Sequence, residues 1–315
     1  MPETKQTAFV FAKPHANTPA FLAKIKEKFD EKGISIVSEG EIDGKTIDAK
    51  GYIDQHYYAI ASKATIMKPK ELNIPTDKFK EFAGEEWSTV LEENRAFNAM
   101  DVQAELKINA EELDTLWAGV KKAKKLVKFG GGFYCGLVSE PTESKPEAKK
   151  IYTFNAFFMS MRGKFTDPKG SVHYYVVTFD PAKLAWADFR GKVLGPTDPA
   201  TAPADSLRGI VNSDWKELGL TAAPDTGDNG VHASASPFEG LAERVNWLGQ
   251  DMEKDEFASK LLAAGIPKAM LEAWSVDPQV TLPGGDGKKG SLFDQLEDMD
   301  IDDCIAKCKE IHAAQ

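Results

Sequence analysis

Cysteine is scarce in this sequence, with only Cys135, Cys304 and Cys308 among 315 residues. Such an odd and sparse set of cysteines cannot form a disulfide framework. Cys304 and Cys308 lie at the i,i+4 spacing of a helix, but no second pair lies nearby to complete a zinc site. We therefore expect all three cysteines to be packing residues.

Long apolar runs are also absent. No stretch approaches the ~20 residues that a membrane span needs. The first residues contain no apolar segment after a basic start, as a secretory leader would. The expectation is a cytoplasmic protein that does not insert into a membrane.

Positive charge is in deficit. Lys and Arg together number 39, against 49 Asp and Glu, which gives a formal net charge of -10. Such a balance argues against a general affinity for nucleic acid or for an anionic membrane surface. Any phosphate binding must therefore come from a local cluster of basic residues.

Enough hydrophobic sequence is present, 42%, for one large or two ordinary domains. The apolar residues 8–12 predict a buried strand, and Thr18 or Asn17 followed by Pro19 predicts the start of a helix that Gly33 ends. A second strand is expected at residues 34–37. The chain therefore opens as strand, helix, strand.

Later segments carry different patterns. Residues 65–150 are rich in Lys and Glu at amphipathic helical spacing, which predicts an inserted helical subdomain with a flexible hinge at residues 130–132. Strand-forming residues return at 172–179, and Asp180-Pro181 predicts a helix to about residue 189. Ser236-Pro237 predicts one more core helix. Residues 251–315 are expected to form a helical C-terminal extension.

Three short motifs carry the functional signal, and each consists of residue types suited to phosphate chemistry. They are VFAKPHAN at residues 10–17, LGPTDPATAPADSLRG at residues 194–209 and DNGVHASAS at residues 228–236. In their order and flanking elements they resemble the nucleoside diphosphate kinase family. The resemblance covers residues 5–64 and 151–250, about half of the chain.

This resemblance implies an α+β fold, with a ferredoxin-like βαββαβ antiparallel sheet and helices on one face. It implies one domain formed by residues 5–64 and 151–250, interrupted by the insertion at 65–150 and followed by the extension at 251–315. It also implies that the protein binds nucleoside di- and triphosphates, with Mg²⁺ carried by the nucleotide.

The resemblance also implies roles for individual residues. His232 falls on the histidine that carries the phosphoryl group, and Glu243 is matched to the acid that orients it. Arg190 is the arginine beside the position, occupied by Gly191, where the family has a second phosphate-binding arginine. The nucleotide-binding positions implied are Lys13, Tyr57, Phe154, Arg190, Thr197, Arg208 and Asn229.

General chemistry supports these residue types independently of the family. A neutral imidazole can attack a terminal phosphate and hold it as a phosphohistidine, which divides one difficult transfer into two easier steps. Cations and hydrogen-bond donors stabilise the charge on the transferring group. Lys13 and Arg208 can supply charge, Tyr57 and Thr197 can donate hydroxyl hydrogen bonds, and Asn229 can bond the sugar.

Two functions follow from these observations. The first is a phosphotransferase that acts through phospho-His232. The second is a nucleotide-binding or structural protein within a larger assembly such as a cilium or the cytoskeleton, because Ala233 and Ala235 replace the family's Gly and Asp and about half of the chain is additional. In either case the resemblance implies a homo-oligomer, or an assembly through the insertion and the extension.

Overall fold

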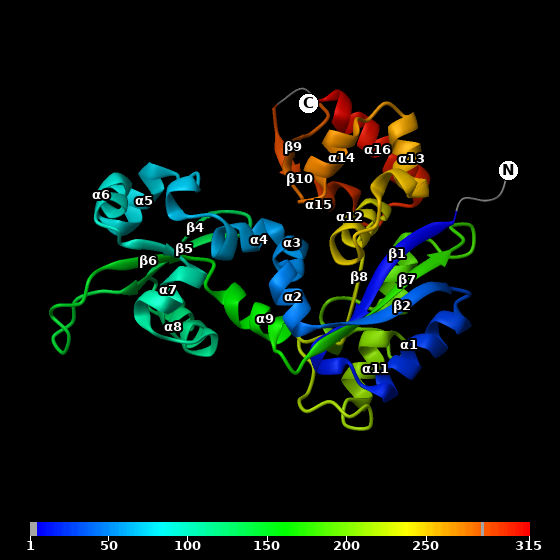
Figure 1. Ribbon diagram of the computed structural model, residues 1–315, viewed down its shortest axis with the longest axis horizontal. Coiled ribbons are helices and arrows are strands. Elements are labelled where there is room, and N and C mark those ends of the chain that lie inside the picture. Colours follow the sequence, from blue (N-terminus) through cyan, green and yellow to red (C-terminus); the bar gives the residue numbers. More distant parts are fainter. Residues whose placement is uncertain (1–4, 285–286) are drawn as a thin grey trace. The chain divides into compact units, whose positions relative to one another are not determined.

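The computed structural model describes residues 5–284 and 287–315. The chain divides into two compact units, the first made of Met1–Tyr52 with Phe165–Gln315 and the second of Ile53–Lys164 (Figure 1). Within the described ranges, no helix is long and apolar enough to cross a membrane.

The first unit is built on a four-stranded antiparallel sheet with the order β2-β7-β1-β8. Numbered within this unit alone, the order is 2-3-1-4, which is the strand order of a ferredoxin-like βαββαβ sheet. The expected α+β, ferredoxin-like fold is therefore confirmed for this unit. Its strands are β1 (Gln6–Ala12), β2 (Ser35–Asp43), β7 (Ser171–Phe179) and β8 (Val231–Ala233).

Helices cover both faces of this sheet, whereas the prediction placed them on one face. Figure 1 shows α1 (Pro19–Glu31) and α11 (Leu207–Asp214) together on one side, and α12 (Pro237–Leu248) on the other. Strand β1 is apolar along nearly its whole length, so each of its faces needs a cover. Ala8, Val10 and Ala12 join the core beneath α1 and α11, while Phe9 and Phe11 pack on Trp247 of α12.

The predicted helix starts are confirmed at two positions. The Thr18 hydroxyl accepts a hydrogen bond from the backbone N–H of Phe21 at 3.2 Å, and Ser236 caps α12 in the same way. Gly240 then allows α12 to lie close to β1, because a Cβ atom at that position would stand 2.9 Å from the Thr7 carbonyl oxygen. Capping and this close approach together fix the direction of α12 across the sheet.

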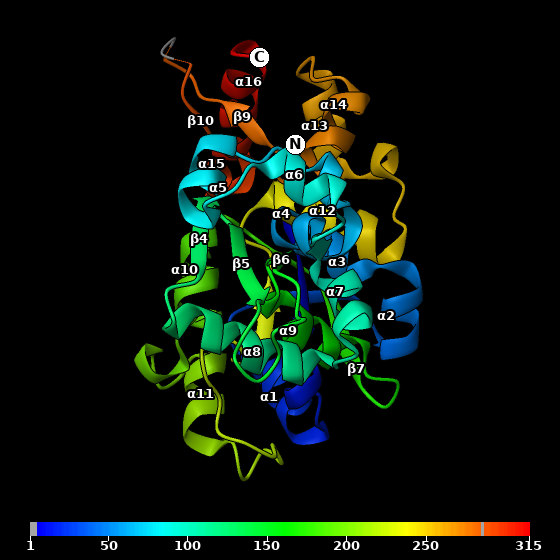
Figure 2. The same ribbon diagram turned by 90° about the vertical axis from the view of Figure 1, so that its left-hand side faces the viewer.

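The C-terminal extension packs on α12 and belongs to the first unit. Phe238 and Leu241 of α12 share one hydrophobic cluster with the extension, and this cluster contains Cys304 and Cys308. Both cysteines are fully buried and neither forms a disulfide, in agreement with a packing role. Figure 2 shows α13, α14 and α16 grouped at the end of this unit that is opposite to α1 and α11. The extension contains α13 (Glu256–Ala263), α14 (Lys268–Trp274), α15 (Leu292–Leu296) and α16 (Ile301–Ala313), with a two-stranded ladder of β9 (Gln279–Thr281) and β10 (Lys289–Ser291).

The second unit corrects the expectation of an entirely helical insertion. It contains a second four-stranded sheet with the order β3-β6-β5-β4, flanked by short helices. Residues 130–132, expected to be a hinge, connect β4 to β5 in a hairpin. The strands are β3 (Ala96–Asn98), β4 (Leu126–Gly130), β5 (Phe133–Ser139) and β6 (Ile151–Phe154), and the longer helices are α5 (Thr76–Ala83), α7 (Ala99–Leu106), α8 (Ala110–Lys122) and α9 (Phe157–Thr166).

The boundaries between the units also differ from the expected ones at residues 64 and 151. Strand β6 pairs with β3 and β5, so residues 151–154 belong to the second unit. Residues 53–64 form short helices, α3 (Tyr52–His56) and α4 (Tyr58–Ala61) among them, and contribute Ala61 and Ala64 to a core cluster of the same unit. The second unit therefore extends beyond both predicted junctions, since it covers Ile53–Lys164 and not residues 65–150 alone.

The helix expected after Asp180-Pro181 is replaced by a turn and a short distorted segment. Helix α10 (Trp186–Asp188) runs directly into a π-helix, η4 (Phe189–Leu194). The wider turn of a π-helix frequently occurs at functional sites. Here it places Arg190 and Leu194 beside the cavity described below.

Cleavage of the exposed loop at Lys149 should leave the two fragments associated. Strand β1 pairs with β7 along its whole length, from Gln6↔Phe179 to Ala12↔His173. Because β1 lies in one fragment and β7 in the other, separation of the fragments would leave the edges of both strands unpaired. Trypsin-nicked protein should elute from a sizing column as one species in native buffer and as two in denaturant. Two fragments that separate in native buffer would contradict this account of the fold.

Candidate active site

His232 lies in the middle of β8, the edge strand beside β1. Its backbone pairs with Phe11, and its imidazole stacks on the Phe11 ring with a centroid distance of 4.7 Å and an interplanar angle of 25°. The side chain is 15% exposed. Packing against an aromatic ring therefore fixes the plane of the imidazole before any ligand binds.

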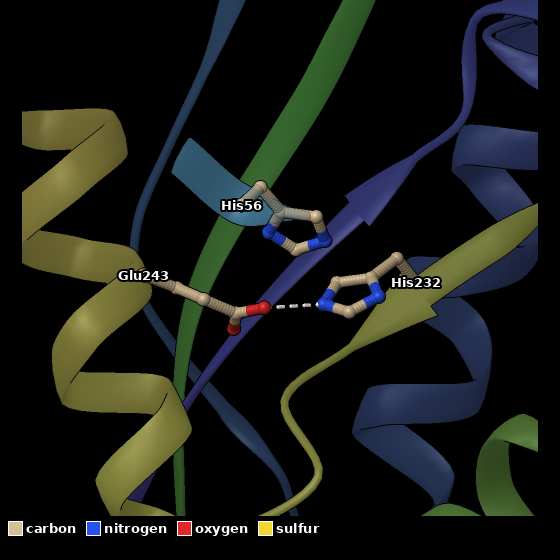
Figure 3. A group of neighbouring side chains, drawn as sticks. All are labelled: His56, His232 and Glu243. Atoms are coloured by element: carbon tan, nitrogen blue, oxygen red, sulfur yellow. Dashed lines mark hydrogen bonds and ion pairs between the residues drawn. The ribbon is translucent and has the colours of Figure 1, made fainter. Parts of the chain in front are cut away.

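Glu243 of α12 holds one nitrogen of that imidazole. His232 Nε2 lies 2.5 Å from Glu243 Oε1. A dashed line marks this contact in Figure 3. The second carboxyl oxygen, Oε2, accepts a hydrogen bond from the Ser234 hydroxyl at 2.6 Å. His56, which is also drawn in Figure 3, belongs to the second unit. An Nε2–H that donates to Glu243 leaves the lone pair of the imidazole on Nδ1.

The environment favours neutral forms of both groups. Burial, followed by the positive charges of Lys13, Arg208 and Arg190, holds the pKa of His232 well below its usual range. Burial raises the pKa of Glu243 to about 8, although the Ser234 hydrogen bond and the charge of Arg244 act in the opposite direction. At pH 7 His232 is therefore neutral, as a nucleophile must be.

These shifts predict how the free energy of unfolding depends on pH. Between its usual pKa of 4.5 and about 8, Glu243 holds a proton in the folded protein that the unfolded chain has released, so stability falls as pH rises through this window. Glu243→Gln removes this titrating group, so the free energy of unfolding should fall less steeply with pH, by up to ~1.4 kcal/mol per pH unit. Urea unfolding of both proteins between pH 6.5 and 8 measures the difference, and parallel slopes would contradict it.

The loop before His232 closes on the turn that follows β1. The Lys13 backbone N–H donates to the Gly230 carbonyl at 2.9 Å, and Lys13 Nζ donates to the Gly227 carbonyl at 2.9 Å. The Gly230 N–H in turn donates to His15 Nε2 at 3.1 Å. Lys13 is 8% exposed, so these contacts hold its positive charge in a buried position near His232.

Arg208 and Asn229 join the loops on either side of the histidine. Arg208 Nη1 donates to the Gly195 carbonyl at 2.7 Å, and Nη2 donates to the Val231 carbonyl at 2.9 Å. Asn229 Nδ2 donates to the Thr197 carbonyl at 2.9 Å. Both side chains thus position the loop that contains Thr197 beside β8.

These elements surround one cavity of about 440 Å³. Four residues predicted for the site line it together, namely Arg190, Thr197, Arg208 and His232. Asn229 and Glu243 do not line the cavity, but they bind the lining residues Thr197 and His232. Lys13 does not line it either, but its positive charge acts on His232. The cavity is large enough for the phosphates of a nucleotide, and its wall presents two guanidinium groups, a hydroxyl and an imidazole.

Comparison with known proteins gives similarity to solved structures alone. No protein-family model matches the sequence, and no curated protein matches it. The structure is similar to nucleoside diphosphate kinases, at TM-scores below 0.5. Among them are the enzyme of Encephalitozoon cuniculi in its apo form (14% identity, 78% of this chain and 90% of that chain, TM-score 0.37), the enzyme of Pyrobaculum aerophilum (18% identity, 78% and 96%, TM-score 0.36) and the enzyme of Aquifex aeolicus (15% identity, 77% and 94%, TM-score 0.33).

Two of the predicted nucleotide-binding residues belong to the second unit. Phe154 of β6 is fully buried, with its ring against Trp87 and Phe133, so its faces are covered by protein and it does not offer a stacking surface for a base. Tyr57 is half-buried against a hydrophobic cluster of the same unit. The nucleotide-binding role expected of Phe154 is therefore corrected, because β6 is a central strand with apolar neighbours.

Sequence reasoning missed three acidic residues that line the cavity, Glu239, Glu297 and Asp298. Glu239 lies in the first turn of α12, where its carboxylate accepts a hydrogen bond from the Ala235 N–H at 2.9 Å. Glu297 and Asp298 come from the extension, more than sixty positions after His232 in the chain. The acidic run around them resembles any solvated surface segment, so no local signal indicated their place.

Proposed function

We propose that this protein transfers the terminal phosphate of a nucleoside triphosphate to a nucleoside diphosphate through a phosphohistidine at His232. The observation that carries the proposal is the placement of the His232 imidazole. It is stacked on Phe11, bound through Nε2 to Glu243, and exposed to a cavity that also contains Arg208 and Thr197.

The proposed first step is attack by the Nδ1 lone pair on the terminal phosphorus. The Nδ1–P bond forms while the bond from phosphorus to the bridging oxygen breaks, and the nucleoside diphosphate leaves with that electron pair. In the second step a terminal oxygen of another nucleoside diphosphate attacks the phosphorus. The P–N bond then breaks and its electron pair returns to Nδ1.

Glu243 contributes by accepting the Nε2–H of the imidazole. Phosphorylation of Nδ1 places positive charge on the ring, which favours release of the Glu243 proton, and the resulting carboxylate, 2.5 Å from Nε2, stabilises that charge. The same contact fixes the tautomer, so that the lone pair on Nδ1 is available for attack. We therefore assign Glu243 as a positioning residue.

The basic residues of the site stabilise the negative charge on the transferring phosphate. Arg208 lines the cavity, and Lys13 is held near His232 by its bond to Gly227. Preorganised cations stabilise the charge on the equatorial oxygens, and the Mg²⁺ that enters with the nucleotide neutralises part of it. We assign Thr197 of the cavity lining as a hydroxyl donor, and Asn229, which donates to the Thr197 carbonyl at 2.9 Å, as the residue that positions it.

A second candidate is a nucleotide-binding scaffold without transfer activity. Arg190, one of the two guanidinium groups of the cavity, is already paired with Glu297 and Asp298, which weakens the case for triphosphate binding. In this alternative the protein acts in a homo-oligomer or another protein assembly, with contacts made by the second unit and the extension.

Separate measurements of binding and exchange distinguish the two candidates. Calorimetry with Mg-ADP measures binding, and a coupled assay with one nucleoside triphosphate and a different diphosphate measures exchange. Exchange with ping-pong kinetics supports the phosphotransferase. Binding without any exchange would contradict it and favour the scaffold, because ground-state binding requires no nucleophile.

A further inference from the structure

The C-terminal extension supplies two residues to the cavity of His232. We infer that Glu297 and Asp298 set the affinity of this cavity for anions by competing with the ligand for Arg190. This inference rests on the proposed function insofar as it takes the cavity to be the phosphate site. Its test uses binding alone, so it can fail or succeed independently of phosphate transfer.

The competing contacts are direct. Arg190 Nη1 lies 2.7 Å from Glu297 Oε1 and 2.6 Å from Asp298 Oδ1. All three side chains line the cavity together with His232 and Arg208. A guanidinium that donates to two carboxylates has fewer donors left for a phosphate, since both ligands bind to the same planar fork.

The backbone of residues 297–301 is anchored by hydrogen bonds to other parts of the first unit. The Asp298 N–H donates to the Ala235 carbonyl at 2.9 Å, and Asp300 Oδ1 accepts hydrogen bonds from the Trp186 N–H and from Gln6 Nε2, each at 2.7 Å. The Ile301 N–H donates to Gln6 Oε1 at 3.0 Å. The backbone that carries the two carboxylates is therefore a fixed part of the cavity wall, and we expect Arg190 to be released by rotation of side chains without movement of that backbone.

The two ion pairs are weak enough to be displaced. The Arg190 side chain is 28% exposed, and those of Glu297 and Asp298 are each 47% exposed. Ion pairs at this exposure are weak, because solvent screens the attraction between the charges. A ligand must overcome these pairs and the repulsion between its phosphates and the two carboxylates, so the extension lowers affinity without closing the site.

The test compares the full-length protein with the double variant Glu297→Gln/Asp298→Asn. The amides preserve side-chain shape, and Asn is suited to position 298, where the backbone φ is +62°. Isothermal titration with inorganic triphosphate as the probe should show about tenfold tighter binding by the variant. The matched control, Glu272→Gln/Glu310→Gln, removes two exposed carboxylates of the extension outside the cavity and should bind like the unmodified protein.

A second comparison tests whether the effect passes through Arg190. In an Arg190→Gln background the same double substitution should change affinity less than about twofold, because no guanidinium remains for the acids to hold. Equal affinity of the double variant and the unmodified protein, absence of triphosphate binding by both, or a full gain in the Arg190→Gln background would each overturn the inference. Tighter triphosphate binding by the double variant, in a protein that transfers no phosphate even with His232 intact, would support the inference while the proposed function fails.

Discussion

His232→Asn is expected to reduce phosphate exchange between nucleotides by at least about a thousandfold, because the reaction then has no nucleophile. Binding of Mg-ADP should change little, since Arg208, Thr197 and Lys13 remain. The asparagine amide is smaller than imidazole and can remain between Phe11 and Glu243, so the fold should be retained. A coupled exchange assay and calorimetry on the same preparation measure the two effects.

His173→Asn is the matched control for that substitution. His173 belongs to β7 of the same sheet, with its ring 3.2 Å from Glu39 Oε2 and outside the cavity lining. Exchange by this variant should equal that of the unmodified protein. If His232→Asn retained exchange, the phosphohistidine mechanism would be wrong.

Glu243→Gln should lower kcat for exchange ten- to a hundredfold while KM changes little. The carboxyl group does not line the cavity and acts only through the imidazole. An amide cannot stabilise the positive ring of the phosphorylated histidine as a carboxylate does, and loss of such an orienting partner typically costs this much activity. Steady-state kinetics with both nucleotides varied separate the two constants.

Ser234→Ala provides a graded comparison. It removes the hydrogen bond to Glu243 Oε2 but retains the carboxyl group, so the loss in kcat should be smaller than for Glu243→Gln. A rise in KM at constant kcat in Glu243→Gln would instead assign Glu243 to nucleotide binding and contradict its positioning role.

The first unit could be predicted from sequence because its signals are local. Thr18 with Pro19, and Ser236 with Pro237, mark helix starts within four residues, and the apolar run of β1 is unambiguous. The second sheet could not be predicted in this way. Strand β3 is three residues long and pairs in parallel with β6, Ala96 opposite Tyr152, so its existence depends on a partner far away in the chain.

The residues of the candidate site could likewise be predicted only in part. The DNGVHASAS motif indicated His232, and Glu243 was matched to the family's acid with one extra residue in the spacing between them. Arg190 was named beside an alignment position held by Gly191, and the π-helix brings it to the cavity. The acids that hold Arg190 lie in the extension, and their place depends on how that extension packs on α12, which no motif describes.

The central claim is that His232 carries the phosphate as a phosphohistidine. Its most direct test is to incubate the unmodified protein with terminally labelled Mg-ATP and to determine the chemical nature of the label that it acquires. A phosphohistidine is labile in acid and stable in alkali, so the account predicts label with those properties, about one per chain, on the peptide that contains His232. The label should pass to an added nucleoside diphosphate. Protein that binds Mg-ATP yet acquires no such label, or that carries it on another residue, would contradict the account.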